Sequence, residues 1–166
     1  MTEPVERTIE KIAVPDKELE RKAQAHLDIL TKPRGSLGRL EEIARRYVAI
    51  TGQEPPVLKK KKVFVFAGDH GVAREGVSLF PPEVTAQMVF NFVSGGAGVN
   101  VLAGHVGAEV EVVDVGVDYD FACQSGITDR KVRRGAGNIM KEPAMTEEEL
   151  GRALAAGIGL AGESAR

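Results

Sequence analysis

The chain has 166 residues, of which 43% are hydrophobic and 28% are charged, so it is long enough to form a real core and does not have the composition of a disordered tail. Its formal net charge of −2 at pH 7 provides no general attraction to nucleic acid or to an anionic membrane, which leaves a small molecule as the expected partner. The single cysteine, Cys123, excludes an internal disulfide and fits a reducing compartment.

The N-terminal segment gives no sign of export. Its first residues, MTEPVERTIEKIAV, lack the basic start and apolar centre of a signal peptide. No run in the chain approaches 18 consecutive apolar residues, as a membrane-spanning helix requires. We therefore expect a soluble, cytoplasmic protein with no membrane contact.

Two helical patterns precede residue 58. Over 16–30 apolar residues recur at helical spacing, and Asp16 is placed to cap the first turn. A second pattern follows the turn TKPRGS, can be capped by Ser36 and should end at Gly52. The segment GQEPPVLKK then breaks the helical period because prolines lack a backbone donor. We place a domain boundary there, between the N-terminal helices at 1–58, as part of a smaller helical domain, and an α/β segment at 59–166.

The α/β segment predicts a parallel sheet. Apolar runs rich in β-forming residues occur at 63–67 and 110–117, the second interrupted only by an Asp and a Gly. Helical stretches lie between them at about 82–93 and 98–106. Two strands joined through helices favour a parallel pair with helices on the faces of the sheet rather than a hairpin.

A last helix opens at Thr146, where Thr-Glu-Glu-Glu forms a capping-box pattern. No strand pattern follows this helix, and two strands make a poor sheet. We therefore expect the chain to hold an incomplete parallel sheet.

The most distinctive polar residues follow the first predicted strand. Gly-Asp-His-Gly places Asp69 and His70 at the carboxyl end of a parallel strand, where ligands of such sheets bind. The flanking glycines permit a sharp turn and a close approach of the backbone to a ligand. In the alternative interpretation Asp69 caps a turn and His70 bonds to a neighbouring carbonyl. A metal site requires further ligands, and none stands at a helpful spacing nearby, so we expect no metal.

A loop before the third helical stretch carries apolar side chains and is followed by an amide. Ser78, Leu79 and Phe80, with Gln87 about one turn inside the helix, could receive a flat heterocycle. The helical phase places Val84 and Met88 on the core-facing side, with Gln87 beside them. Alternatively, Leu79 and Phe80 staple the helix start onto the core.

Glycines between the two central helices form another candidate. Ser-Gly-Gly-Ala-Gly, with Gly95 and Gly96, precedes a helix, so free amides and the helix dipole could hold a phosphate. The pattern matches neither a P-loop nor a dinucleotide fingerprint. A glycine-rich turn between packed helices explains it equally well.

Two short basic runs remain. The runs at 59–62 and 130–134 contain no interleaved aromatic residues and are typical of solvated edges. We expect no nucleic-acid partner.

The chain as a whole resembles the nicotinate-nucleotide:dimethylbenzimidazole phosphoribosyltransferase family of cobalamin biosynthesis. The resemblance rests on four stretches in the family's order: LTKPRGSLGRLEEIA, FAGDHGVAREGVSLFPPEVTAQMVFNFVSGGAGVNVLA, VVDVGVD and the closing AMTEEE helix. It implies a Rossmann-like parallel sheet, a smaller helical domain built from both chain ends, and a homodimer. It also implies transfer of phosphoribose from nicotinate mononucleotide to 5,6-dimethylbenzimidazole, giving α-ribazole 5'-phosphate and nicotinate, without a cofactor.

The resemblance also assigns roles to residues. It implies that the loop of Ser78, Leu79 and Phe80, together with Gln87, forms one wall of the benzimidazole pocket. It further implies that the family's general-base glutamate belongs to a C-terminal half that this sequence lacks, so that no catalytic residue is expected in this chain.

The remaining implied site residues are two pairs, Asp69 with His70 and Gly95 with Gly96, which border the cleft. Other functions stay open at this point. The chain could be a nonenzymatic nucleotide- or base-binding module or one half of a split enzyme, and a metal-dependent hydrolase built on Asp69 and His70 is a third possibility.

Overall fold

The structure is a computed structural model that describes residues 3–122 and 126–165, so Cys123 lies outside the described residues. The chain divides into two compact units, one made of residues 12–59 and the other of residues up to 11 and from 60 onward. We call them the helical unit and the α/β unit.

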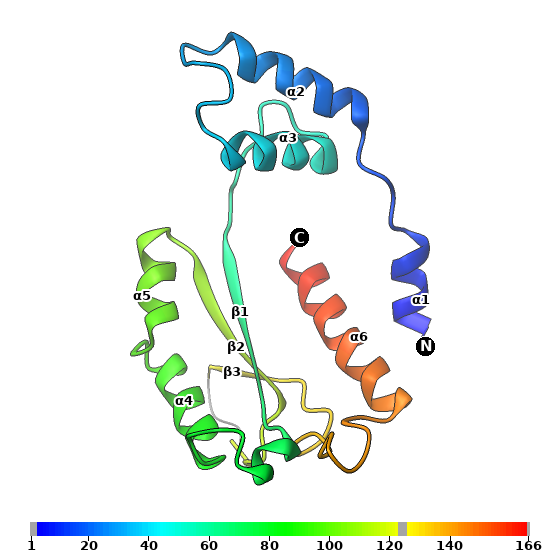
Figure 1. Cartoon of the computed structure of the whole chain (residues 1–166), viewed down its shortest axis with the longest axis vertical. Coiled ribbons are helices and arrows are strands. Elements are labelled where there is room, and N and C mark those ends of the chain that lie inside the picture. Colours follow the sequence, from blue (N-terminus) through cyan, green and yellow to red (C-terminus); the bar gives the residue numbers. More distant parts are fainter. Residues whose placement is uncertain (1–2, 123–125, 166) are drawn as a thin grey trace. The chain divides into compact units, whose positions relative to one another are not determined.

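The helical unit is a pair of packed helices, α2 (Lys17–Ile29) and α3 (Arg39–Thr51) (Figure 1). The predicted cap at Asp16 is confirmed, since its carboxylate accepts hydrogen bonds from the backbone N–H groups of Glu18 at 2.7 Å and Leu19 at 3.2 Å. The predicted end at Gly52 is confirmed as well, because Gly52 adopts a left-handed conformation with φ of 67°.

The predicted cap of the second helix at Ser36 is wrong. Helix α3 begins at Arg39, after Gly38 with a φ of 55°, and has no side-chain cap. The carboxylate of Glu41 holds the preceding turn instead, because it accepts hydrogen bonds from Leu37 N at 3.1 Å and Lys32 Nζ at 2.8 Å. The carboxylate of Glu41, which lies inside the helix, thus accepts a backbone hydrogen bond near the helix start, where Ser36 was expected to do so.

Glu41 is a buried charged residue, with 5% of its surface exposed. The hydrogen bond from Lys32 and then that from Leu37 N hold the pKa of Glu41 below its ordinary value. Glu41 thereby links the turn at 32–38 to the start of α3.

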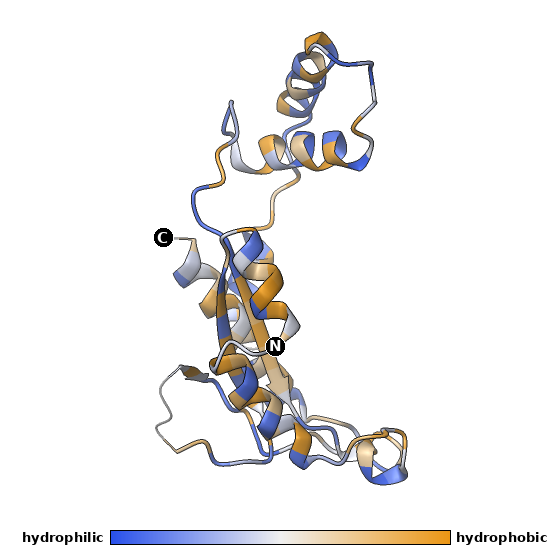
Figure 2. Ribbon diagram, turned by 90° about the vertical axis from the view of Figure 1, so that its left-hand side faces the viewer, coloured by the Kyte–Doolittle hydropathy of each residue, from blue (hydrophilic) through white to orange (hydrophobic). Residues whose placement is uncertain are grey.

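The α/β unit is built on three parallel strands in the order β1-β2-β3 (Figure 1). Hydrophobic residues alternate with hydrophilic ones along the helices (Figure 2). The elements in chain order are α1 (Glu3–Glu10), β1 (Lys62–Gly68), the 3-10 helix η1 (Gly71–Glu75), α4 (Glu83–Val93), α5 (Gly98–His105), β2 (Glu109–Gly116), β3 (Ile127–Asp129) and α6 (Glu147–Ser164).

The predicted α/β class, its two long strands and the helices between them are confirmed. Strand β3 was not predicted, since three residues are too few for a hydrophobic period. Helix α1 was not predicted either; it contacts α6 and buries Val5.

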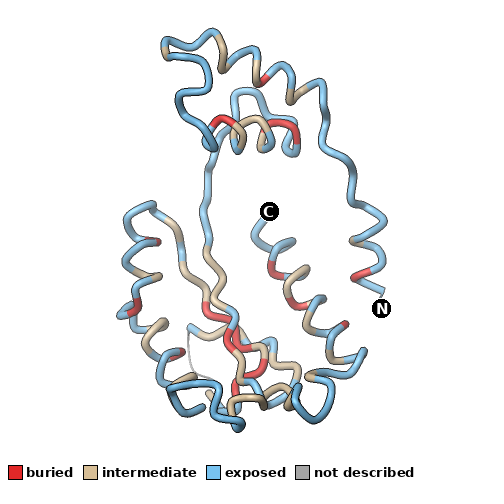
Figure 3. The backbone as a smooth tube through the Cα atoms, in the orientation of Figure 1, coloured by how far each residue is buried: buried red, intermediate tan, exposed pale blue. Residues whose placement is uncertain are grey.

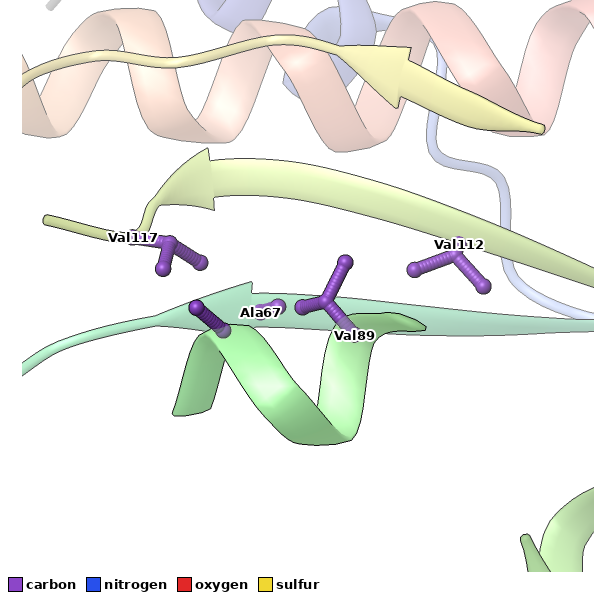
Figure 4. Packing of buried hydrophobic residues seen from close by; sticks show 5 residues of the cluster. Ala67, Val89, Val112 and Val117 are labelled. Atoms are coloured by element: carbon purple, nitrogen blue, oxygen red, sulfur yellow. The ribbon is translucent and has the colours of Figure 1, made fainter. Parts of the chain in front are cut away.

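The core lies where the carboxyl-terminal halves of the strands meet α4, and buried residues gather there (Figure 3). Val89 of α4 lies against the sheet with Ala67, Val112 and Val117 (Figure 4). The predicted core-facing pair of α4 is wrong. The structure buries Ala86 and Val89, and the short side chains of these two residues allow α4 to pack against the sheet.

Helix α6 covers the opposite face of the sheet (Figures 1 and 4). Val113 is fully buried, and it points away from α4 because successive strand residues alternate between faces. The predicted capping box is confirmed, since Glu149 N donates to Thr146 Oγ1 at 3.2 Å and Thr146 N donates to Glu149 Oε2 at 2.8 Å. Over residues 3–122 and 126–165, no helix is long and apolar enough to cross a bilayer.

Replacing Glu41 by Gln tests its role in the helical unit. Because the pKa of Glu41 is lowered in the folded state, its carboxylate stabilises the fold above its ordinary pKa of 4.5 and loses this effect as the pH falls through the folded-state value. We expect Glu41→Gln to speed hydrogen exchange of the α3 amides at pH 7 and to differ little from the parent chain at low pH.

Glu42→Gln is the matched control, because Glu42 is more exposed and pairs with Arg39 and Arg46 on the helix surface. Equal effects of the two substitutions at pH 7 would contradict the role assigned to Glu41.

Candidate functional site

The carboxyl end of β1 is bound to a segment far along the chain. Ala136 N donates to Asp69 O at 2.8 Å, and Gly71 N donates to Ala136 O at 3.0 Å. The same segment is tied to β2, because Gly135 N donates to Gly116 O at 2.9 Å. The sequence Gly-Asp-His-Gly therefore continues the parallel pairing beyond the regular strand.

Gly71 is required by this close approach. A Cβ at Gly71 would lie 2.7 Å from Ala136 O and 2.8 Å from Asn138 N, which are backbone atoms that cannot rotate away. The glycine after His70 thus allows two backbone segments to touch, whereas the sequence predicted a close approach to a ligand.

Asp69 is half-buried and its carboxylate reaches across to the end of β2. Its Oδ2 accepts a hydrogen bond from Asp118 N at 2.8 Å. Asp69 therefore joins two strand ends, whereas the alternative interpretation had it capping its own turn. His70 is exposed, and its imidazole makes no hydrogen bond to another described residue.

A cleft of about 520 Å³ opens beside this end of β1. It is bounded by the end of β1, the loop at 77–82 and one side of α4, and most of its lining is apolar. That volume and character suit an aromatic ligand with a few polar contacts. The lining includes Asp69, His70, Ser78, Phe80, Thr85 and Met88.

The loop presents one aromatic ring to this cleft. Ser78 Oγ accepts a hydrogen bond from Phe80 N at 3.2 Å and donates one to Phe80 O at 3.0 Å, which closes a tight turn. Phe80 lines the cleft, while Leu79 is 98% exposed and lies outside the lining. The staple interpretation requires Leu79 and Phe80 to pack into the core, and the structure exposes both side chains instead.

The other predicted site residues lie elsewhere. Gln87 is exposed on α4 and outside the cleft lining. Gly95 and Gly96 form the turn between α4 and α5, where Gly95 N donates to Phe92 O at 3.2 Å and Gly96 N donates to Asn91 O at 3.0 Å. These two amides already have backbone acceptors, which favours the structural interpretation of the glycine run.

A short polar cluster ties η1 to the segment after Gly137. Glu75 Oε1 accepts hydrogen bonds from Asn138 Nδ2 and Lys141 Nζ, both at 2.6 Å. The bonds from Lys141 and then Asn138 lower the pKa of Glu75. Helix η1, which leads from His70 to the cleft loop, is thus bound at both ends: Gly71 contacts Ala136, and Glu75 contacts Asn138 and Lys141.

The end of β2 holds a buried ion pair that was not predicted. Asp114 is 3% exposed, and its Oδ2 lies 2.7 Å from Lys131 Nζ. The available signal was a charged residue inside the apolar run VVDVGV. The interpretation of 130–134 as a solvated basic edge is wrong for Lys131, whose side chain is only 21% exposed.

The described residues include no cluster of three or more His, Cys, Asp or Glu side chains that could hold a metal ion. The polar side chains of the cleft lining that could contact a ligand directly are those of Asp69, His70, Ser78 and Thr85.

Comparisons with known proteins point to one family. A family model described as phosphoribosyltransferase matches residues 12–166. A nicotinate-nucleotide–dimethylbenzimidazole phosphoribosyltransferase of Geobacter sulfurreducens is 62% identical over 158 residues, which are 95% of this chain and 45% of the relative. One of Chlorobium chlorochromatii with the same name is 54% identical over 165 residues, or 99% of this chain and 47% of the relative.

Solved structures agree with these matches. A crystal structure of an enzyme of this name from Thermus thermophilus has a TM-score of 0.79 and 48% identity, covering 86% of this chain and 43% of that one. A structure of CobT from the same organism has a TM-score of 0.81 and 46% identity, covering 89% and 44%. The chain therefore spans just under half the length of these relatives.

The glycine at the strand end gives a direct test of the site geometry. We expect Gly71→Ala to lower the free energy of unfolding of the α/β unit by about 1–3 kcal/mol, because backbone atoms must move to admit the methyl group. Gly157→Ala is the control: no atom lies within 4 Å of the new methyl in α6, so it should raise stability by about 0.5–1 kcal/mol. Urea unfolding followed by far-UV circular dichroism measures both, and an unchanged midpoint for Gly71→Ala would contradict the close approach.

Proposed function

The chain belongs to the phosphoribosyltransferase family whose model matches it, and we propose that it serves transfer of phosphoribose from nicotinate mononucleotide to 5,6-dimethylbenzimidazole. The products would be α-ribazole 5'-phosphate and nicotinate, in the nucleotide-loop branch of cobalamin synthesis. The observation that carries this proposal is the largely apolar cleft of about 520 Å³ at the carboxyl end of β1.

The cleft has suitable chemistry for the benzimidazole. Its aromatic and aliphatic lining can stack on a flat ring, and Phe80 is the exposed aromatic residue of the loop that faces it. Ser78, Asp69 and His70 supply polar groups at its edge. The other residues implied by the family resemblance, Leu79, Gln87, Gly95 and Gly96, would have to meet a substrate from outside this cleft.

The reaction requires one proton acceptor. Nicotinate leaves the ribose carbon as a neutral ring nitrogen, so its departure needs no general acid. The incoming benzimidazole loses its N–H proton, so a base must lie near the cleft. The family resemblance assigns that base to a glutamate in the half of the relatives that this chain does not span, so transfer would need that half as well.

A second candidate is a nonenzymatic base-binding module or one half of a split enzyme. The observation that favours it is the cleft lining, which includes no glutamate among the described residues. Binding of 5,6-dimethylbenzimidazole without transfer under all conditions distinguishes the module from the enzyme.

We also propose a cytoplasmic homodimer. Strand β1 lies at one end of the strand order, so its outer edge has no strand partner among the described residues. Phe66 in this strand, which also lines the cleft, is 48% exposed. Such an apolar edge favours association. Sedimentation equilibrium should show a dimer that Phe66→Lys weakens, while Val101→Lys on α5, which is 59% exposed, should leave it intact. A monomer at all concentrations would contradict this proposal.

A complementation assay tests the proposed transfer. The chain is mixed with a polypeptide that contains the region of the Geobacter sulfurreducens relative lying beyond the match, and α-ribazole 5'-phosphate is followed by chromatography. We expect product from the mixture and none from either polypeptide alone. Transfer by the chain alone would show that its base lies among its own residues, and no product from a mixture that forms a complex would contradict the proposal.

Two neighbouring residues provide matched variants in the same assay. We expect Phe80→Ala to raise the KM for dimethylbenzimidazole by about 5- to 20-fold through lost apolar contact, with the KM for nicotinate mononucleotide nearly unchanged. Leu79→Ala should change neither value, because Leu79 lies outside the cleft lining. The opposite ranking would place the base pocket elsewhere.

A further inference from the structure

The peptide group between Val117 and Asp118 is held from both sides. Its carbonyl oxygen accepts a hydrogen bond from Lys131 Nζ at 2.5 Å, and its N–H donates to Asp69 Oδ2 at 2.8 Å. The two atoms belong to one planar amide, so neither bond can rotate independently of the other. An ammonium on the oxygen and a carboxylate on the N–H also polarise the amide in the same direction, which strengthens both bonds.

The ammonium of Lys131 is itself fixed. It has three N–H donors, and the structure provides three acceptors: Asp114 Oδ2 at 2.7 Å, Val117 O at 2.5 Å and Tyr119 O at 3.0 Å. A rotation of the side chain would break several of these bonds together. Lys131 therefore has one position relative to the end of β2.

The partners of Lys131 are fixed as well. Asp114 Oδ1 accepts hydrogen bonds from Gly116 N at 3.1 Å and Val117 N at 2.9 Å, so both carboxylate oxygens are engaged. The side chain of Val117 is 1% exposed and belongs to the cluster that packs against α4 (Figure 4). The peptide after Val117 thus leaves the core in a defined direction.

Stability alone does not explain the buried ion pair of Asp114 with Lys131. Burial of two charges costs solvation energy that their attraction only partly returns, so an apolar pair of similar volume is often as stable. The effect that an apolar pair could not reproduce is the hydrogen bond from Nζ to the Val117 carbonyl. The arrangement therefore points to control of geometry at the strand ends.

We propose that Lys131 is a positioning residue for the Asp69 carboxylate, acting through the Val117–Asp118 peptide group. With Oδ2 held on Asp118 N, the other oxygen of Asp69 has no hydrogen-bond partner among the described residues, and Asp69 lines the cleft. Lys131 thereby determines which oxygen is offered to a ligand. The relevance for a ligand rests on the proposed function, whereas the positioning itself does not.

The test compares two variants that both lack the Asp114 charge. Asp114→Asn keeps the ammonium on the Val117 carbonyl, and Asp114→Asn/Lys131→Met removes it. Nuclear magnetic resonance of the 166-residue chain, without ligand, gives the hydrogen-exchange rate of the Asp118 amide and the shift of the Asp69 carboxyl carbon. The Asp69 amide, which donates to Gly116 O at 3.0 Å, reports general loosening of the strand ends.

We expect the double variant to exchange the Asp118 amide at least about tenfold faster than Asp114→Asn, as loss of a charge-assisted arrangement predicts. The Asp69 carboxyl carbon should shift while the Asp69 amide exchanges nearly as before. Equal behaviour of both variants would overturn the proposal. An equal increase in the exchange rates of all amides would overturn it too, because Lys131 would then stabilise the strand ends in general and would not position Asp69.

A second measurement requires no change in the core. In Asp69→Asn, the weaker acceptor at Asp118 N should move the Nζ resonance of Lys131, while that of Lys141, bonded to Glu75, should stay unchanged. No movement at Lys131 would overturn the proposal even if the double variant did not fold. Because neither experiment contains substrate, failed complementation and failed positioning are separate results.

Discussion

The parallel pairing of β1 with β2 determines the arrangement of the candidate site. The register is regular from Lys62 to Ala67 and then shifts, so that Gly68 pairs with Gly116. This shift brings Asp69 N onto Gly116 O and lets the Asp69 carboxylate reach Asp118 N. The irregularity is a local change of register of the kind found at strand ends, and it lies at the glycine pair Gly68 and Gly116. The Asp69 link and the attachment of the segment at 135–137 both lie at this irregularity.

The sequence was sufficient for elements that depend on local chemistry. Asp16, Gly52 and Thr146 bond to atoms within a few residues, so their side chains identify helix ends without knowledge of the rest of the chain. The long strands were identifiable because both are nearly continuous in apolar residues. The cap predicted at Ser36 was wrong because Glu41, inside the helix that follows, accepts the hydrogen bond from Leu37 N instead. Glu41 is held there by Lys32, which follows the preceding helix.

The site was predictable only in part. Glycines around Asp69 and His70 marked a strand end, and Phe80 was identifiable as an apolar residue in a loop. The ion pair of Asp114 with Lys131 could not be paired from the sequence, because Lys131 stands in a run of basic residues that are otherwise more exposed. The expectation for Gln87 depended on which side of α4 faces the core. The predicted core-facing pair was Val84 and Met88, but the structure buries Ala86 and Val89. In this orientation Met88 lines the cleft and Gln87 lies outside its lining.

The contacts that build the cleft edge have a consequence for the order in which the chain folds. The bond from Asp118 N to Asp69 spans 49 residues, and that from Asn138 to Glu75 spans 63. Closure of such long loops costs chain entropy before any contact compensates for it, whereas the turn between α2 and α3 closes over 9 residues through Lys32 and Glu41. The helical pair can therefore form early, and the cleft edge should consolidate late, after β1, α4 and β2 have assembled. The end of the sheet that carries the candidate site is then the part of the α/β unit that the nascent protein completes last.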